Sequence, residues 1–161
     1  MIHFAALTAE LYRAILARGI SQTEALSLTA GVTRRVYERM AAFPTFVSRL
    51  GGRSRRRRLR RATNAFRRFP FGPPAYEMTD VESDADVVAF DVHRCPVAEY
   101  FESQELNTLC LEAWCNLDYA LAERWGAQLQ RSGTLAEGAE RCDFRWHIVP
   151  GGESKTEGEW T

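Results

Sequence analysis

The stretch EAWCNLDYALAERW, residues 112–125, has the apolar spacing of an amphipathic helix. The predicted helix runs from about residue 106 to 125 and has three arcs at about 100° per residue. Its apolar arc holds Leu106, Leu109, Cys110, Ala113, Trp114, Leu117 and Leu121. Cys115 and Asp118 fall on a separate arc, one turn apart, which places a thiol beside a carboxylate.

Strand-like segments lie on both sides of this helix in the sequence. Residues 75–81 and 87–95 are separated by a polar turn and predict a hairpin, in which Val88, Phe90 and Val92 share one face. Residues 127–135 and 141–149 alternate in the same way, and Cys142 points toward the core. Directly after the segment 87–95, CPVAEYF (95–101) predicts a helix with Cys95 at its positive end, where a thiolate is stabilised.

Two further helices are predicted before residue 50. The first follows apolar residues spaced from Phe4 to Leu16 and ends at Gly19. The second starts at the capping box of Ser21 and Glu24, places Leu28, Val32 and Val36 on its apolar face, and ends at Pro44. The sequence therefore predicts an α+β fold, in which N-terminal helices and the long central helix pack on a short antiparallel sheet.

The net charge of zero hides two oppositely charged halves. Residues 1–72 carry 15 Arg and 3 Glu, a net +12, and residues 73–161 carry a net −12. Nine of the arginines lie in the run Arg53–Arg68, which we interpret as a solvated surface whose deletion spares catalysis. Nucleic acid or another polyanion is the alternative partner of this run, and the opposite charges also allow a homo-oligomer.

The predicted organisation has four parts: an N-terminal helical region (1–50), an Arg-rich linker or short helix (51–74), an α+β core with the cysteines (75–149) and a mobile tail (150–161). Charges interrupt the first nineteen residues, so neither a signal peptide nor a membrane span is expected there. We therefore expect a cytoplasmic protein whose four cysteines stay reduced as core thiols, reactive thiols or metal ligands.

Three elements of the sequence resemble a known enzyme family: RCPVAEYF (94–101), CNLDYALAE (115–123) and TLAEGAERCDFRW (134–146). They are similar to the L-2-amino-thiazoline-4-carboxylic acid hydrolase family over about residues 75–148. The resemblance implies a hydrolase of a small nitrogen- and sulfur-containing ring, without an organic cofactor. It selects Cys95, Cys115, Asp118, Thr134, Gly138 and Cys142, and it passes over Cys110, which the helical pattern also assigns to the core.

A thiol beside a carboxylate favours a particular chemistry. A neighbouring carboxylate disfavours the thiolate, unless a cation offsets its charge or it takes the thiol proton itself. A protonated cyclic amidine is such a cation, so Asp118 could orient the ring while Cys115 attacks it. Cys95 is the rival nucleophile, Cys142 completes the catalytic set, and Arg94 or Arg145 would bind the substrate carboxylate, with Thr134 as a further substrate-binding residue.

Three other functions fit the same residues. Cys95, Cys115 and Cys142, with Asp118 or His93, would make a tetrahedral set for zinc or another soft metal, although paired C-x-x-C motifs are missing. The Cys-Asp-Cys order is also locally similar to organomercurial lyases. Alternatively, the chain is a non-catalytic module that binds a small ligand among its thiols. Metal analysis and turnover of a cyclic amidine separate these functions.

Overall fold

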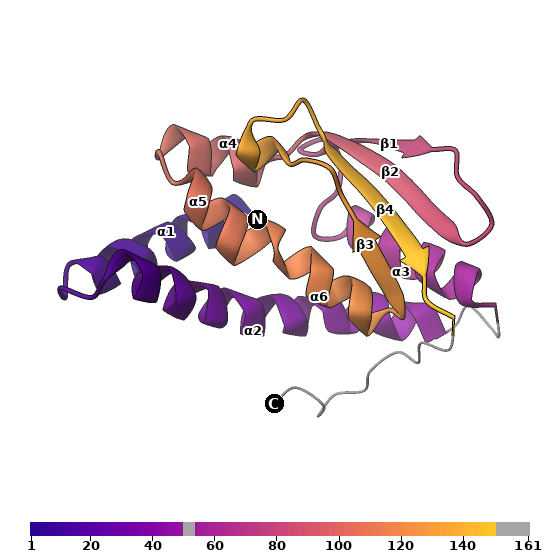
Figure 1. Cartoon of the computed structure of the whole chain (residues 1–161), viewed down its shortest axis with the longest axis horizontal. Coiled ribbons are helices and arrows are strands. Elements are labelled where there is room, and N and C mark those ends of the chain that lie inside the picture. The colour runs from indigo at the N-terminus through magenta and orange to yellow at the C-terminus, as the bar shows by residue number, and fades with distance from the viewer. Residues whose placement is uncertain (50–53, 151–161) are drawn as a thin grey trace.

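The predicted α+β class is confirmed by the computed structural model, which describes residues 1–49 and 54–150. A four-stranded antiparallel sheet in the order β1-β2-β4-β3 carries the helices on one side (Figure 1). The strands are β1 (Glu77–Val81), β2 (Val87–Arg94), β3 (Ala127–Gln130) and β4 (Cys142–Ile148). The helices are α1 (Ile2–Leu16), α2 (Gln22–Arg49), α3 (Arg55–Arg68), α4 (Pro96–Ser103), α5 (Asn107–Cys110) and α6 (Leu117–Arg124). Arg53 and the predicted tail from residue 151 onward lie outside the described residues.

The sheet follows the predicted alternation closely. β1 and β2 form the expected hairpin, and β4 lies between β2 and β3. Phe90 of β2 pairs with Phe144 of β4, and their rings stack at 4.9 Å on the buried face. Residues 127–135 are strand only as far as Gln130, because the chain then turns into a short 3-10 helix, η2 (Leu135–Glu137).

The predicted central helix is present but contains one widened turn. α5 continues directly into a π-helical turn, η1 (Leu111–Cys115), and then into α6. The amide N–H of Asn116 donates to the carbonyl of Leu111 at 2.9 Å, five residues earlier rather than four. Side chains after this turn are therefore rotated relative to the positions expected for a continuous α-helix.

The buried stripe of α2 differs from the prediction. Leu28 and Val32 are 47% and 49% exposed, whereas every fourth residue of another face is buried: Ala25, Thr29, Thr33, Tyr37, Ala41 and Thr45. Most of these side chains are small, so α2 can approach η1 closely, and the hydroxyls of Thr33 and Thr45 donate to carbonyls one turn earlier. The predicted end at Pro44 is also wrong, since the helical backbone continues to residue 49.

The arginine run forms a helix that is part of the core. Leu59, Ala62, Thr63 and Phe66 of α3 are buried against the sheet and α2, while most of the arginines point outward. Ser54 caps the helix by accepting the N–H of Arg57. The packing argues against the expectation that this segment can be deleted without loss of catalysis, because its removal would expose one side of the core.

Stability measurements should distinguish the two faces of α3. We expect Leu59→Ala to lower the free energy of unfolding by about 2–5 kcal/mol, because Leu59 is 2% exposed and its removal leaves a cavity. The matched control is Arg60→Gln on the exposed face, which should change the free energy of unfolding by less than about 0.5 kcal/mol. Urea denaturation of both variants measures the difference, and equal effects would contradict this packing.

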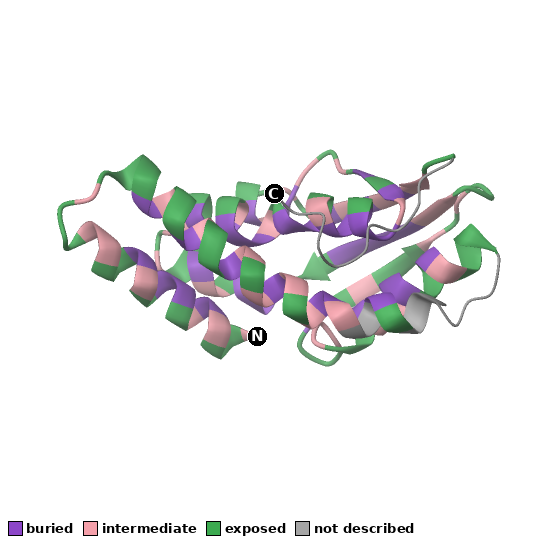
Figure 2. Cartoon of the chain, turned by 90° about the horizontal axis from the view of Figure 1, so that it is seen from below, coloured by how far each residue is buried: buried purple, intermediate pink, exposed green. Residues whose placement is uncertain are grey.

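Buried residues occur on the helices and on the strands (Figure 2). The core that they form consists of two adjoining clusters of buried side chains. The first joins the sheet with α2, α3 and α6, and the second joins α1, α4, α5 and η1. Four partly buried residues pack against both clusters: Phe71, Met78, Cys95 and Leu135. Within the described residues, no helix has the length and apolar character needed to cross a lipid bilayer.

Candidate active site

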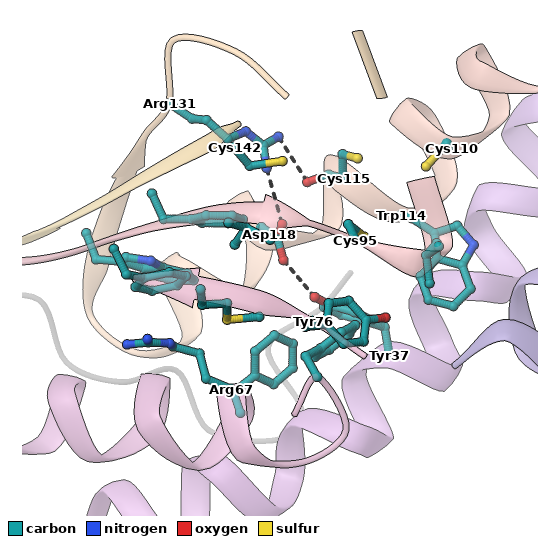
Figure 3. Close-up of a pocket in the computed structure, with 18 residues that line it drawn as sticks. Tyr37, Arg67, Tyr76, Cys95, Cys110, Trp114, Cys115, Asp118, Arg131 and Cys142 are labelled. Atoms are coloured by element: carbon teal, nitrogen blue, oxygen red, sulfur yellow. Dashed lines mark hydrogen bonds and ion pairs between the residues drawn. The ribbon is translucent and has the colours of Figure 1, made fainter. Parts of the chain in front are cut away.

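A cavity lies where the two core clusters meet, between the buried face of the sheet, α3 and the central helix. Cys95, Cys115, Asp118 and Cys142 all line it, as expected from the sequence (Figure 3). They come from three separate elements, namely the start of α4, the central helix and β4. Most of the remaining wall is aromatic or aliphatic: Tyr37, Phe66, Phe71, Tyr76, Met78, Phe90, Val92, Val97, Trp114, Phe144 and Trp146.

Cys110 also lines this cavity, which the sequence did not predict. It is 1% exposed and so belongs to the core as expected, but it lies close enough to Cys115 to raise the pKa of that thiol. Residues five apart lie about 140° apart around a regular α-helix, so the predicted helix separated the two thiols. The π-helical turn of η1 brings them onto the same side.

Asp118 is held from two directions. Its Oδ1 accepts a hydrogen bond from the hydroxyl of Tyr37 at 2.6 Å, and its Oδ2 accepts one from Arg131 at 3.3 Å. Burial raises the pKa of the Asp118 carboxyl, although Arg131 and Tyr37 act in the opposite direction. Asp118 is therefore a buried carboxylate with a cationic partner and an increased affinity for a proton.

Arg131 is the main site residue that the sequence analysis missed. Its guanidinium donates to Asp118 and to the carbonyl oxygen of Cys115, the latter at 3.3 Å, and its side chain is only 3% exposed. The rings of Tyr119 and Phe144 each lie 5.3 Å from its guanidinium carbon. The sequence does contain a signal for Arg131. The alternation of residues 127–135 places Arg131 on the inward face of the strand, where a charged side chain is unusual.

Burial keeps the thiols of the cavity protonated. Cys95 caps α4 as predicted, but burial raises its pKa to about 12, and the N–H groups of Ala98 and Val97 offset only part of this effect. Burial raises the pKa of Cys142 to about 11, although Leu135 N–H donates to its sulfur at 3.2 Å. The neighbouring thiol of Cys110 and burial raise the pKa of Cys115 well above the usual value. The prediction of a stabilised thiolate at Cys95 is therefore wrong for the free protein.

The raised pKa values predict a loss of stability in alkali. In the unfolded chain these thiols ionise near pH 9, but in the folded chain Cys142 and Cys95 ionise only near pH 11 and 12. Their contribution to stability is complete below pH 9 and is lost as the pH rises to 11–12, at about 1.4 kcal/mol per pH unit for each thiol. Denaturation at pH 8–11 should show a shallower decline for Cys95→Ala. The exposed control Ser103→Ala should decline as the unmodified chain does, and identical slopes for all three proteins would contradict the assignment.

Three predicted substrate-binding residues lie elsewhere. Arg94 is exposed and forms an ion pair with Glu99 at 2.8 Å, and Arg145 bonds to Asp91 at 2.8 Å on the outer face of the sheet. Thr134 is buried, but its hydroxyl caps η2 by accepting the N–H of Glu137. None of the three lines the cavity, so the arginines that can meet a ligand there are Arg131 and Arg67.

Several residues of the motif TLAEGAERCDFRW (134–146) shape the loop around Thr134, so their role is structural. Gly138 ends η2 with φ +82°, a conformation that favours glycine. Asp143 accepts the backbone N–H groups of Ser132 and Gly133 at 2.9 and 3.1 Å. These bonds hold the loop so that Leu135 N–H meets the sulfur of Cys142.

The described residues do not form the ligand set that the metal-binding alternative requires. Across residues 1–49 and 54–150, no group of three or more His, Cys, Asp or Glu side chains has an arrangement that could hold a metal ion. His93, the alternative ligand, is exposed and bonds to Thr79 at 2.8 Å. The thiols therefore meet at the cavity wall without forming the tetrahedral site considered from the sequence.

Comparison with known proteins identifies the family. The model of the L-2-amino-thiazoline-4-carboxylic acid hydrolase family matches residues 1–146, which include the two N-terminal helices and the arginine-rich α3 as well as the cysteine-bearing core. No match was found among curated proteins, and none among solved structures. The chain belongs to the L-2-amino-thiazoline-4-carboxylic acid hydrolase family.

Proposed function

We propose that the chain hydrolyses a small cyclic amidine of the 2-amino-thiazoline class, with Cys115 as nucleophile and Asp118 as proton acceptor. The observation that carries the proposal is the position of Arg131, which bonds both to the Asp118 carboxylate and to the backbone of Cys115. A carboxylate beside a thiol disfavours the thiolate unless a cation offsets its charge. Arg131 supplies that cation from the protein itself.

The cavity suits a small, flat substrate. It offers about 90 Å³ to the centres of water-sized molecules. Since one water needs about 10–15 Å³ of such space, there is room for about six to nine waters, or for one small ring compound. The rings of Phe90 and Phe144 form part of the apolar wall that such a ring would contact.

The proposed reaction starts with transfer of the Cys115 proton to Asp118. The thiolate adds to the ring carbon between nitrogen and sulfur, the ring carbon–sulfur bond breaks, and the ring sulfur leaves with the proton held by Asp118. Water then attacks the carbon attached to Cys115, which releases a urea with a free thiol and restores the Cys115 thiol. One water is consumed for each ring opened.

Asp118 is suited to this role by its surroundings. Burial gives it a raised pKa, which makes it a better proton acceptor than an exposed aspartate. Each of its oxygens accepts one hydrogen bond and has capacity for another, so a cationic amidine can bind while Tyr37 and Arg131 stay in place. Cys95 and Cys142 line the same cavity and are the rival nucleophiles.

The test is turnover by the purified protein. We expect incubation with 2-amino-thiazoline-4-carboxylate to release one thiol for each ring opened, measured with a thiol-reactive dye, and to add the mass of one water to the substrate. Related cyclic amidines define the breadth of the site. Tight binding of such rings without any product would favour the non-catalytic module, and a stoichiometric zinc ion in the purified protein would favour the metal-binding function.

A further inference from the structure

The wall of the cavity contains four buried hydrogen-bond donors that have no partner in the described part of the chain. Three are neutral and one is a cation: the hydroxyl of Tyr76, the indole N–H groups of Trp114 and Trp146, and the Nε–H group of Arg67. A buried donor without an acceptor destabilises the folded state, and the loss is larger when the donor is charged. The Nε–H group of Arg67 is therefore the donor that gains most from an acceptor on a ligand.

Arg67 is held by two neighbours that leave this donor unused. Its Nη1 donates to Oδ1 of Asp80, whose side chain is 79% exposed. Its guanidinium carbon lies 4.5 Å from the centre of the Phe90 ring. A guanidinium has five N–H donors, so the bond to Asp80 leaves Nε–H for a second acceptor.

Arg67 lies on the opposite side of the cavity from Arg131 (Figure 3). The ring of Phe144 stacks on Phe90 and lies 5.3 Å from the guanidinium carbon of Arg131, so two stacked rings separate the arginines. Arg131 already bonds to the Asp118 carboxylate. One side of the cavity thus presents a carboxylate, and the other presents a cation with an unused donor.

A second, outer pocket adjoins the cavity at Arg67. Four residues line both spaces: Arg67, Phe71, Tyr76 and Met78. Arg68 and Asp80 line the outer pocket but not the cavity. Arg67 therefore lies where the two spaces meet, within reach of a ligand in the cavity, whereas its neighbour Arg68 does not reach that ligand.

We propose that Arg67 binds the carboxylate of the substrate through Nε–H and so selects ring acids over rings without an acid group. This inference rests on the proposed ring hydrolysis and names the contact that recognises the acid. A guanidinium matches a carboxylate in charge and in shape. The substrate carries a cationic amidine at one end and a carboxylate at the other, and these ends meet Asp118 and Arg67. Arg67 thus takes the role predicted for Arg94 and Arg145, which do not line the cavity.

The test compares 2-amino-thiazoline-4-carboxylate with 2-amino-thiazoline, which lacks the carboxylate. The measured quantity is the ratio of kcat/KM for the acid to kcat/KM for the unsubstituted ring. We expect this ratio to fall by about 10- to 100-fold in Arg67→Gln, as for the loss of a hydrogen bond to a charged group. The two compounds share the amidine end, so a structural defect that slows both equally would leave the ratio unchanged.

Arg68→Gln is the matched control. Arg68 is the next residue of α3 and is exposed, so the substitution removes the same charge beside the cavity but not in its wall. Its ratio should stay within about twofold of that of the unmodified protein, because an exposed charge is screened by solvent. A fall as large as in Arg67→Gln would show that the general charge of α3 attracts the acid, and would overturn the proposed contact.

Arg67→Lys tests the donor without removing the charge. Lysine keeps a cation at this position but has no Nε–H group, and it binds a carboxylate as a point charge. The ratio should therefore lie between those of the unmodified protein and Arg67→Gln. A ratio equal to that of the unmodified protein would overturn the assignment to Nε–H, even if Arg67→Gln does not fold. A thermal melt shows which variants are folded.

The remaining outcomes separate this inference from the proposed function. An unchanged ratio in folded Arg67→Gln would overturn the assignment of Arg67, while the ring hydrolysis would stand. If the unmodified protein opens neither ring, the proposed hydrolysis fails. Calorimetry should then still show that the acid binds the unmodified protein at least about tenfold more tightly than Arg67→Gln. Equal affinities would overturn the carboxylate site as well.

Discussion

Turnover of the thiazoline ring should fall by about three orders of magnitude or more in Cys115→Ser, with little change in the fold. The substitution nearly conserves shape, but a hydroxyl is far less ionised than a thiol and is a much weaker nucleophile. Cys115 is half-buried at the end of η1, so the backbone around it has no reason to move. Thiol release gives the rate, and a thermal melt confirms that the variant is folded.

Cys110→Ser is the matched control for this prediction. Cys110 lies five residues earlier on the same helix, lines the same cavity and is close enough to Cys115 to raise the pKa of its thiol, but it has no step in the proposed reaction. Its turnover should therefore stay within about tenfold of the unmodified protein. Full activity in folded Cys115→Ser would remove Cys115 as the nucleophile, and Cys95→Ser and Cys142→Ser would then show which thiol attacks.

Replacing Arg131 by methionine should reduce both stability and activity. Arg131→Met leaves the Asp118 carboxylate buried without its cation, and breaking a buried pair in this way costs about 3–5 kcal/mol. Adding Asp118→Asn removes the unpaired charge, so the double variant should recover much of the free energy of unfolding. It should not recover turnover, because the proton acceptor is then absent. Urea denaturation and thiol release measure the two quantities separately.

The outer face of the sheet offers a matched control for the Arg131 variant. Arg141 forms an ion pair with Asp91 at 3.1 Å, but its side chain is 49% exposed. Arg141→Met should therefore cost no more than about 1 kcal/mol and should leave turnover unchanged. Equal losses of stability in Arg131→Met and Arg141→Met would show that the Arg131–Asp118 pair contributes no more than a surface pair.

Periodic sequence patterns predicted the elements whose residues follow one strand or helix periodicity from end to end. The hairpin of β1 and β2, the inward face of β4 and the Pro96 start of α4 follow from alternation or from helix-start signals. The buried face of α2 was predicted wrongly. It consists largely of alanine and threonine, whereas a hydrophobicity pattern favours Leu28 and Val32. The core role of α3 was hidden in the same way by the arginines between Leu59 and Phe66.

The candidate site was predicted in part. Cys95, Cys115, Asp118 and Cys142 line one cavity, as expected, although their catalytic roles stay a prediction. Arg94 and Arg145 were predicted to bind the substrate carboxylate, but successive side chains of a strand point to opposite faces, and both arginines lie away from the cavity. Tyr37 was missed because it comes from α2, which is 81 positions from Asp118, and no local pattern reports a contact over that distance.

The widened turn in the central helix accommodates one extra residue without turning the rest of the helix away from the core. A π-helical turn corresponds to one residue inserted into a regular helix, and α5 and α6 keep their relative orientation because the wide turn absorbs that residue. If the same residues formed a continuous α-helix, every side chain after the insertion would be rotated by about 100°. Deleting one residue from 111–115 should therefore restore a regular turn and leave α6 facing the core, whereas inserting a further residue would rotate it. The extra residue changes which side chains meet within the turn, such as Cys110 and Cys115, and leaves the rest of the core aligned.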